Sequence, residues 1–305
     1  MIDSVTSGEP LVAGVELGGT KSIAVMARGR RVLRAFRTPT ADPASTLTSL
    51  AERLSGWQDR LGLADALGIA SFGPLNLDAG RNGFGRIGTT TKPRWSGVDV
   101  VGPFRGLSGG PIGFDTDVAG AAMAESRWGA ARGQPVAVYV TIGTGIGGGV
   151  LVSGSPVHGG LHPELGHIRV RRAKGDLFPG ICPFHGDCLE GLASGPAIAA
   201  RTGVPADGLS PNHPVWTSVA AEVGELMAVL ILTLSPGRIL IGGGVGMSPA
   251  FPLDSIRAQT RAALGSYLPE LNPAALKSVI RHPTLGANAG PLGAVALGLA
   301  ALRQP

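Results

Sequence analysis

The sequence predicts an α/β protein built as two lobes, and three observations support this prediction. Predicted strands alternate with predicted helices along the chain, which is typical of the α/β class. A chain of 305 residues is long enough for two domains of ordinary size. Two similar units, each a strand, a glycine-rich turn and a second strand, occur at residues 11–28 and 136–153. We therefore expect two related lobes, with no low-complexity linker between them.

The composition favours a folded chain in spite of its many glycines and prolines. The chain has 49 Gly and 24 Pro, which approaches the content of low-complexity chains. However, 44% of the residues are hydrophobic and only 15% are charged, whereas disordered segments combine low hydrophobicity with high charge. We expect the glycines to concentrate where the backbone approaches a ligand.

The charge pattern and the apolar runs exclude several classes of protein. The net charge is +5, but the basic residues are scattered, which favours a solvated surface or an anionic small substrate over a nucleic-acid site. No window approaches the run of about 18 apolar residues that a membrane span requires. Two cysteines are too few for a disulfide scaffold, and the first residues do not resemble a secretory signal. We expect a cytoplasmic protein that binds neither nucleic acid nor a membrane.

The remaining elements follow in chain order. After the first unit we expect a helix, a strand, a glycine-rich loop, a second strand and an Ala-rich helix, at residues 43–63, 66–72, 76–97, 111–116 and 118–131. After the second unit comes an irregular segment at 154–190 that carries both cysteines. Further helices are expected at 194–201, 214–234, 252–268 and 290–303, with an apolar strand at 238–241 between them.

Three glycine-rich turns follow apolar strands and are candidate phosphate sites. The turn at 143–148 formally matches G-x-G-x-x-G, but a strand follows it where a dinucleotide site needs a helix. No P-loop sequence occurs. We expect the backbone N–H groups of the turns to bind phosphates, with ordinary tight hairpins as the alternative. The candidate residues are Gly18, Gly19, Thr20 and Lys21 in the first turn, Gly143, Thr144 and Gly145 in the second, and Gly242, Gly243 and Gly244 in the third.

Acidic residues near these turns are candidates for catalysis and metal binding. Glu16 precedes the first turn, and a carboxylate near phosphates usually acts through Mg²⁺, so Glu16 is a candidate for indirect magnesium binding. Asp117 lies where a strand gives way to a helix. It either caps the helix or acts as the general base that deprotonates an attacking hydroxyl. Asp115 is the rival base on the same segment.

A cluster of potential metal ligands lies in the irregular segment. Cys182, His185 and Cys188 form a C-x₂-H-x₂-C run, and His167 lies 15 residues before Cys182. These four residues supply a closed tetrahedral set of the kind that holds structural Zn²⁺. A local disulfide and unrelated polar loop residues are the alternatives, and a cytosolic setting disfavours the disulfide.

Other polar residues of the chain lack this spacing. Glu164 and Glu190 lie near the potential ligands and either are solvated or bind sugar hydroxyls, because a loop held by a metal would fix their geometry. His158, His162 and His213 show no metal-ligand spacing and are expected on the surface or in loops.

Together these motifs resemble the ROK family of sugar kinases, particularly its bacterial fructokinase branch. The resemblance extends from about residue 11 to 302 and includes the tract IGTTTKPRW at 87–95. The motifs that carry it are GVELGGTK at 14–21, GFDTDV at 113–118, TIGTGIGGG at 141–149, HPELGH at 162–167 and CPFHGDCLEGLASGPA at 182–197. It implies an actin-like ATPase (ribonuclease H-like) fold with two lobes around a central cleft, commonly as a homodimer.

On this basis we expect two lobes with a boundary at the strand–helix junction. The N-terminal lobe would comprise residues 1–117, with the C-terminal helix at 290–305 packing back on it. The C-terminal lobe would comprise residues 118–289 and carry the zinc loop.

The resemblance also implies an activity and roles for individual residues. It implies an ATP-dependent kinase that phosphorylates the 6-hydroxyl of a hexose, with fructose as the leading substrate and Mg-ATP and structural zinc as cofactors. By similarity, Asp117 is the general base, and the three turns bind the phosphates and adenosine of ATP. Residues that match sugar-facing positions are Glu164, His167 and Glu190, and the zinc set is His167, Cys182, His185 and Cys188. A glucose, mannose or N-acetylhexosamine kinase of the same fold, or a sugar sensor without catalysis, are the alternatives.

Two positions depart from the family pattern. Glu16 occupies a position where most of the family has Asp, although the fructokinase branch resembles this chain there. Ala119 occupies a position where Asn commonly follows the base, which puts affinity or substrate choice in question.

Overall fold

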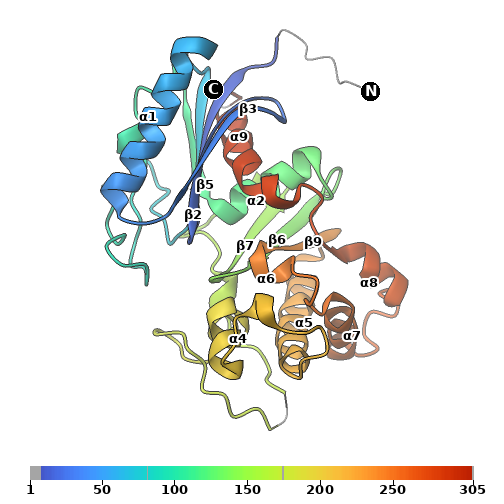
Figure 1. Ribbon diagram of the computed structural model, residues 1–305. Helices are drawn as coiled ribbons and strands as arrows, with labels where there is room; N and C mark the ends of the chain where they lie inside the picture. The colour runs from blue at the N-terminus through green and yellow to red at the C-terminus, as the bar shows by residue number, and fades with distance from the viewer. Residues whose placement is uncertain (1–7, 81, 174, 304–305) are drawn as a thin grey trace. The chain divides into compact units, whose positions relative to one another are not determined.

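The computed structural model describes residues 8–80, 82–173 and 175–303. The chain divides into two compact units, which are described separately (Figure 1). The first unit comprises the described residues up to Trp128, the short segment His158–His162, and the residues from Ala287 onward. The second unit comprises Gly129–Val157 and Pro163–Gly286.

The boundary between the units lies one helix later than the sequence suggested. Helix α2 (Asp117–Trp128) belongs to the first unit, because it packs along the C-terminal helix α9 (Ala289–Ala301). The two helices approach closely where Gly120 faces Gly293: a Cβ added to Gly293 would lie 2.5 Å from the carbonyl carbon of Gly120. The strand–helix junction at Asp117 therefore lies inside a unit and not between units.

The first unit is built on a five-stranded sheet in the order β3-β2-β1-β4-β5. Strands β1 to β3 are antiparallel, whereas β4 and β5 run parallel to β1. Helix α1 covers one face of the sheet, and α9 with α2 covers the other (Figure 1). The strands are β1 (Leu11–Leu17), β2 (Lys21–Arg28), β3 (Arg31–Pro39), β4 (Ala66–Ser71) and β5 (Ile112–Thr116), and α1 spans Pro43–Leu61.

The sequence did not predict β3, and its exposure explains why. None of its nine residues is buried, since β3 is an edge strand that pairs with β2 alone. Arginines at 31, 34 and 37 replace the apolar alternation that identifies a half-buried strand. The predicted helix at 43–63 and the strands at 66–72 and 111–116 are confirmed by α1, β4 and β5.

A row of glycines crosses the sheet beneath α9. Gly14, Gly68 and Gly113 are paired neighbours in adjacent strands. A Cβ at Gly68 would overlap the backbone carbonyl oxygen of Ala294, and one at Gly113 would overlap that of Leu297. Only glycine lets the helix backbone lie this close to the strands. These glycines therefore serve helix–sheet packing, so the approach of backbone to a ligand does not account for all of the glycines.

The second unit is also built on a five-stranded sheet, in the order β10-β9-β6-β7-β8. Its strands are β6 (Val136–Ile142), β7 (Ile146–Val152), β8 (Ser155–Pro156), β9 (Arg238–Gly242) and β10 (Ile280–Arg281). Its helices are α3 (Leu189–Ala193), α4 (Gly195–Thr202), α5 (Val215–Leu234), α6 (Gly243–Gly246), α7 (Leu253–Leu264) and α8 (Pro273–Val279). The predicted helices in this part are confirmed by α4, α5 and α7, whereas α3, α8 and β10 are too short to show a periodicity.

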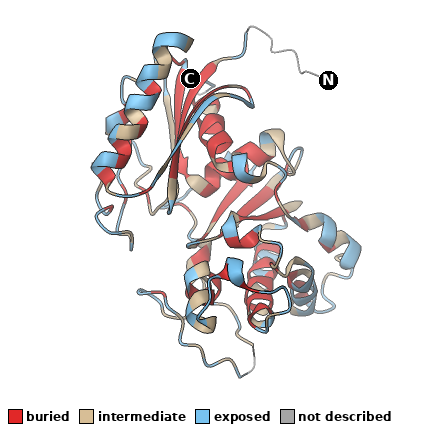
Figure 2. Ribbon diagram, viewed as in Figure 1, coloured by how far each residue is buried: buried red, intermediate tan, exposed pale blue. Residues whose placement is uncertain are grey.

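Helix α5 corrects one expectation about membranes. Within the described residues, it is long and apolar enough by length and composition to cross a membrane, although the sequence was expected to contain no such segment. In the structure, 67% of its most apolar 18-residue stretch is buried, and the helix contributes many residues to the core of the second unit (Figure 2). Glu222 interrupts the apolar surface and is itself fully buried against Arg201. The apolar character of α5 is thus explained by its position in the core.

Candidate functional site

The first glycine turn is the tip of the β1–β2 hairpin, and Thr40 holds it in place. The Thr40 hydroxyl donates to the carbonyl oxygen of Gly18 at 2.7 Å, and the Thr40 backbone N–H donates to that of Thr20 at 2.9 Å. Gly18 in turn donates its N–H to the carbonyl oxygen of Lys21 at 3.0 Å. In these bonds, donors of the protein occupy carbonyl oxygens at the tip that would otherwise repel an anion. The tip is therefore suited to present N–H groups and the Lys21 ammonium to a phosphate.

Glu16 is a strongly perturbed carboxylate at the end of β1. The pKa of Glu16 is raised to about 7, chiefly by burial and also by the negative charge of Asp117, while Lys21 and Arg37 act in the opposite direction. Its Oε2 atom is buried and has no hydrogen-bond partner among the described residues. A Cβ added to Gly290 at the start of α9 would overlap this carboxylate. A buried carboxylate oxygen without a donor is a suitable ligand, direct or through water, for a hard cation such as Mg²⁺.

Asp117 is the first residue of α2, but it is not the cap of that helix. The capping bond comes from Thr116, whose hydroxyl accepts from the backbone N–H of Ala119 at 3.1 Å. One oxygen of Asp117 accepts from the N–H of Val118 at 2.9 Å. Burial raises the pKa of Asp117 to about 6. Asp117 is therefore not needed as the helix cap, which was one of its two expected roles. Its carboxylate has a pKa suited to a general base.

Asp115, the rival base, has both carboxylate oxygens engaged by the protein. It is buried, and its Oδ1 accepts from the N–H of Thr116 at 2.7 Å. Its Oδ2 lies 2.7 Å from Nε2 of His158. Since both oxygens are committed, Asp117 is the better candidate for proton transfer.

The segment His158–His162 joins the first unit through two imidazoles. Besides the contact of His158 with Asp115, Nε2 of His162 accepts from the backbone N–H of Leu75 at 2.9 Å. His162 is only 7% exposed but lies in a loop, which is one of the two positions expected for it. No local spacing signals these contacts, because the partners are separated by 43 and 87 residues in the sequence.

The second and third glycine segments lie side by side in the second unit. They follow β6 and β9, which are parallel neighbours, and a Cβ added to Gly143 would have the backbone nitrogen of Gly244 as its nearest atom, at 3.7 Å. Gly143 donates its N–H to the carbonyl oxygen of Gly145 at 2.9 Å. Gly243 has φ +85°, and a side chain there would overlap the backbone of Ile142. The structure thus brings two of the three predicted phosphate segments to the same end of the sheet, at the carboxyl ends of β6 and β9.

The four predicted zinc ligands converge. The ligand atoms of His167, Cys182, His185 and Cys188 all lie within 4.8 Å of one another, and both cysteines are free thiols, which excludes the alternative of a disulfide. The Nδ1–Sγ distances are 3.5 Å from His167 to Cys188, 3.8 Å from His167 to Cys182 and 3.6 Å from His185 to Cys182. A tetrahedral zinc ion, with bonds of about 2.1 Å to nitrogen and 2.3 Å to sulfur, separates such ligands by about 3.6 Å. The donor set and its spacing therefore fit Zn²⁺.

Burial of the thiols makes metal binding compete with protons. It raises the pKa of the Cys188 thiol to about 11, and the neighbouring Cys182 and Glu190 act in the same direction. A buried thiol with this pKa is protonated at neutral pH unless a metal ion stabilises the thiolate. Metal binding at this cluster should therefore release protons.

His167 connects the metal cluster with Glu190. Its Nδ1 atom faces the two cysteines, while its Nε2 atom lies 3.9 Å from Oε1 of Glu190. Glu190 also accepts from the N–H of Ile146 at 2.9 Å, beside the second glycine turn. Glu164, the third predicted sugar residue, is exposed and accepts from the N–H of His167 through its backbone carbonyl at 3.0 Å. The three predicted sugar residues are thus linked through His167, by its imidazole to Glu190 and by its backbone N–H to Glu164.

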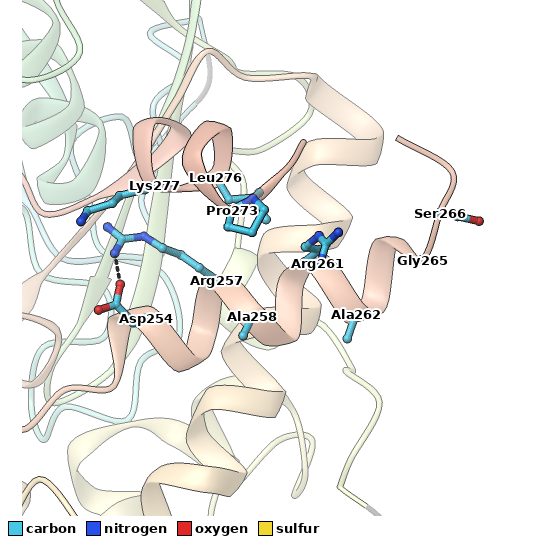
Figure 3. Close-up of a pocket in the computed structure, with 10 residues that line it drawn as sticks. All are labelled: Asp254, Arg257, Ala258, Arg261, Ala262, Gly265, Ser266, Pro273, Leu276 and Lys277. Carbon is cyan, nitrogen blue, oxygen red and sulfur yellow. Dashed lines mark hydrogen bonds and ion pairs between the residues drawn. The ribbon is translucent and has the colours of Figure 1, made fainter. Parts of the chain in front are cut away.

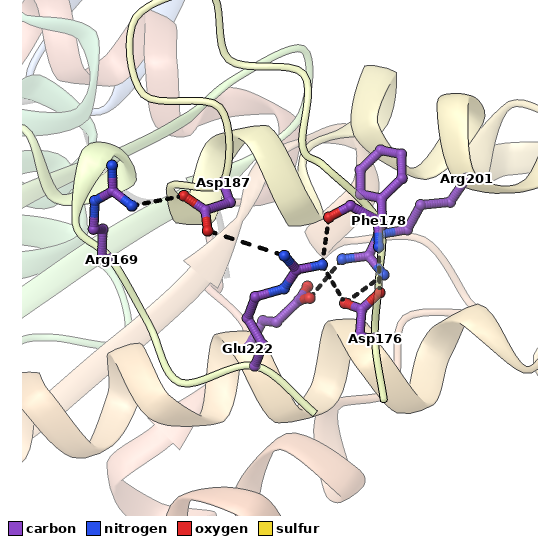
Figure 4. A network of polar contacts seen from close by, with 7 residues as sticks. Arg169, Asp176, Phe178, Asp187, Arg201 and Glu222 are labelled. Atoms are coloured by element: carbon purple, nitrogen blue, oxygen red, sulfur yellow. Dashed lines mark hydrogen bonds and ion pairs between the residues drawn. The ribbon is translucent and has the colours of Figure 1, made fainter. Parts of the chain in front are cut away.

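A network of charged residues, which the sequence did not reveal, links the metal loop to α4 and α5 (Figure 4). The metal loop is the segment that carries the four potential zinc ligands, residues 167–188. Arg201 binds Glu222 at 2.5 Å and Asp176 at 3.0 Å, and Asp176 also binds Arg172. Burial raises the pKa of Glu222 to about 7, against the opposing effect of the Arg201 charge. Asp187, between two of the potential zinc ligands, binds Arg169 at 2.9 Å. The loop is therefore held by ion pairs in addition to its candidate metal site.

The two α/β units, each with a five-stranded sheet and a glycine turn between antiparallel strands, form the actin-like ATPase fold. Residues 12–301 match the ROK family, and the chain belongs to that family. It is 43% identical over 295 residues to a fructokinase of Zymomonas mobilis, covering 94% of this chain and 96% of the relative. It is 36% identical over 296 residues to a fructokinase of Pediococcus pentosaceus, covering 96% and 99%.

Solved structures give the same family. The chain is similar to a ROK hexokinase from Thermus thermophilus, with a TM-score of 0.76, 27% identity and coverage of 96% of this chain and 99% of the other. A ROK family glucokinase from Streptomyces griseus in complex with glucose and AMPPNP is similar with a TM-score of 0.75, 25% identity and coverage of 95% and 99%. These comparisons confirm the resemblance that the motifs carry.

Proposed function

We propose that this protein is an ATP-dependent sugar kinase that phosphorylates the 6-hydroxyl of a hexose, with fructose as the preferred substrate. The observation that carries the proposal is Asp117: Thr116 replaces it as helix cap, and burial raises its pKa to about 6. A base with this pKa is mostly ionised at pH 7 and still accepts a proton readily. The fructokinases at 43% and 36% identity support fructose as the sugar.

In this proposal the carboxylate of Asp117 accepts the proton of the sugar hydroxyl while the hydroxyl oxygen forms its bond to the γ-phosphorus and ADP leaves. The first-turn residues Gly18–Lys21 and the paired turns at 143–145 and 242–244 bind the nucleotide. Mg²⁺, when bound, neutralises charge on the phosphates. Glu16 would hold it, directly or through water, with the buried oxygen that lacks a donor.

The metal loop would supply the sugar contacts. We propose that His167, Cys182, His185 and Cys188 hold a structural Zn²⁺, which fixes the ring of His167. Glu190 would orient that ring through its Nε2 atom, as carboxylates do for metal-bound imidazoles, and would share sugar hydroxyls with Glu164. We also propose a cytoplasmic homodimer, for which light scattering of the purified protein measures the mass.

A sugar panel tests the activity. ADP formation is measured with fructose, glucose, mannose and N-acetylhexosamines, and NMR locates the phosphate on the product. The highest kcat/KM is expected with fructose; a higher value with another hexose would reassign the substrate, and no turnover with any sugar would favour a sensor. Asp117→Asn should lower kcat by at least about 10³-fold. The matched control is Asp59→Asn on the exposed side of α1, which removes the same charge; near-normal turnover in the Asp117 variant would contradict the proposal.

A further inference from the structure

Lys92 reaches the tip of the first phosphate turn from a distant part of the sequence. Its Nζ atom donates to the carbonyl oxygen of Gly19 at 2.6 Å, across 73 residues of chain. With the bonds to Gly18, Thr20 and Lys21 described above, this contact engages the last of the four carbonyl oxygens at the tip. It also places a positive charge beside the N–H groups of the turn.

The turn that carries Lys92 is rigidly anchored. Trp95 is fully buried, and its indole N–H donates to the carbonyl oxygen of Ala41 at 3.0 Å. Its ring packs edge-on against Phe72, with 5.2 Å between centroids. The Trp95 backbone N–H donates to the carbonyl oxygen of Lys92 at 3.2 Å, which closes the turn. The backbone of Lys92 is therefore held in place by a buried aromatic residue.

Among the described residues, Lys92 has no acidic partner to account for its charge. In the part of the chain that the structure describes, no carboxylate forms an ion pair with Lys92, and partial burial lowers its pKa. A neutral donor such as an amide would hold the Gly19 carbonyl equally well. An ammonium has three donors, so two remain for another acceptor, and lysine commonly binds phosphate as a point charge.

We infer that Lys92 is a second phosphate-binding cation, which acts with Lys21 on the terminal phosphates of the nucleotide. The inference rests on the proposed function and adds a residue to its phosphate site. The competing explanation is a purely structural clamp that ties the 87–95 tract to the hairpin. The two explanations differ in whether the charge of Lys92 matters or only its hydrogen bond to Gly19.

Binding of inorganic tripolyphosphate to the full-length protein separates these explanations without requiring sugar turnover. Lys92→Met removes donor and charge, Lys92→Gln keeps a donor without charge, and Lys92→Arg keeps both. We expect calorimetry to show binding weakened about 10- to 100-fold in the Met and Gln variants and retained within a few-fold in Lys92→Arg. The control is Lys277→Met, which removes the same charge from the groove between α7 and α8 in the second unit (Figure 3) and should bind as the unmodified protein does.

Steady-state kinetics supply the second readout. In Lys92→Met and Lys92→Gln, kcat/KM for ATP should fall by about 10²-fold, with little change in the KM of the sugar. Full binding and turnover in Lys92→Gln would show that Lys92 serves only to hold the hairpin through its hydrogen bond. Equal tripolyphosphate binding in Lys92→Met and Lys277→Met would also overturn the inference. If the Met variant does not fold, the Gln and Arg variants decide the same question. Failure of the unmodified protein to bind tripolyphosphate and ATP would overturn the proposed function as well.

Discussion

Replacing Asp117 with Asn should make the protein more stable at alkaline pH, in addition to removing the base. Burial raises the pKa of this carboxylate from 3.8 to about 6, so the folded protein holds the proton more tightly than the unfolded chain. Its contribution to stability is therefore complete below about pH 4 and is lost as the pH rises through about 6. At pH 8 the folded protein contains an ionised, poorly solvated carboxylate at position 117. In Asp117→Asn an uncharged amide of the same shape takes its place, so the cost of burying the charge is removed.

The size of the effect follows from the shift in pKa. Two pKa units correspond to about 3 kcal/mol, and because the residue is only half-buried we expect about 1–2 kcal/mol at pH 8. Asp117 also raises the pKa of Glu16, so its neutralisation relieves a second buried carboxylate in the same pH range. In a chain of 305 residues this gain corresponds to an increase in Tm of about 2–3 °C.

Thermal unfolding without nucleotide measures the prediction at pH 5 and pH 8. The increase in Tm should be present at pH 8 and small at pH 5. The control is again Asp59→Asn, because with a net charge of +5 any loss of an acid also changes long-range repulsion. An equal gain at both pH values, an equal gain in the control, or a loss of stability at pH 8 would refute the reasoning from burial.

Three further outcomes follow from the structure. The kcat/KM of the sugar should fall on the acid side of about pH 6, to about a tenth of its plateau at pH 5, because Asp117 must be ionised; a flat profile down to pH 5 would count against this base. Elemental analysis should find about one zinc per chain and none in Cys182→Ser, whereas natively purified protein without zinc would contradict the metal assignment. Gly68→Ala should lower the free energy of unfolding by about 3 kcal/mol or more, because the new Cβ overlaps the α9 backbone. Gly56→Ala, in the exposed interior of α1, should instead raise it by about 0.5–1 kcal/mol, and equal effects in denaturant titrations would refute the packing argument.

Local patterns allowed much of the fold and part of the candidate site to be predicted. Helices such as α1 and α5 and strands such as β4 show their periodicity or apolar character over consecutive residues. The potential zinc ligands could be found because Cys182, His185 and Cys188 lie in one short run, where spacing alone limits how they are arranged. Strand β3 was missed because an exposed edge strand needs no apolar pattern.

The sequence by itself thus determined the class of fold, the glycine turns and the cluster of potential metal ligands, because these depend on residues close together in the chain. The structure settled a local question that the sequence left open, since Thr116 and not Asp117 caps α2. Only the tertiary structure decided that His158 binds Asp115 and that Lys92 reaches Gly19. It also assigned glycines such as Gly68 to packing, although their number in the sequence suggested ligand binding. These roles depend on contacts between segments distant in sequence, which no local spacing encodes and which form only when the strands and helices pack together.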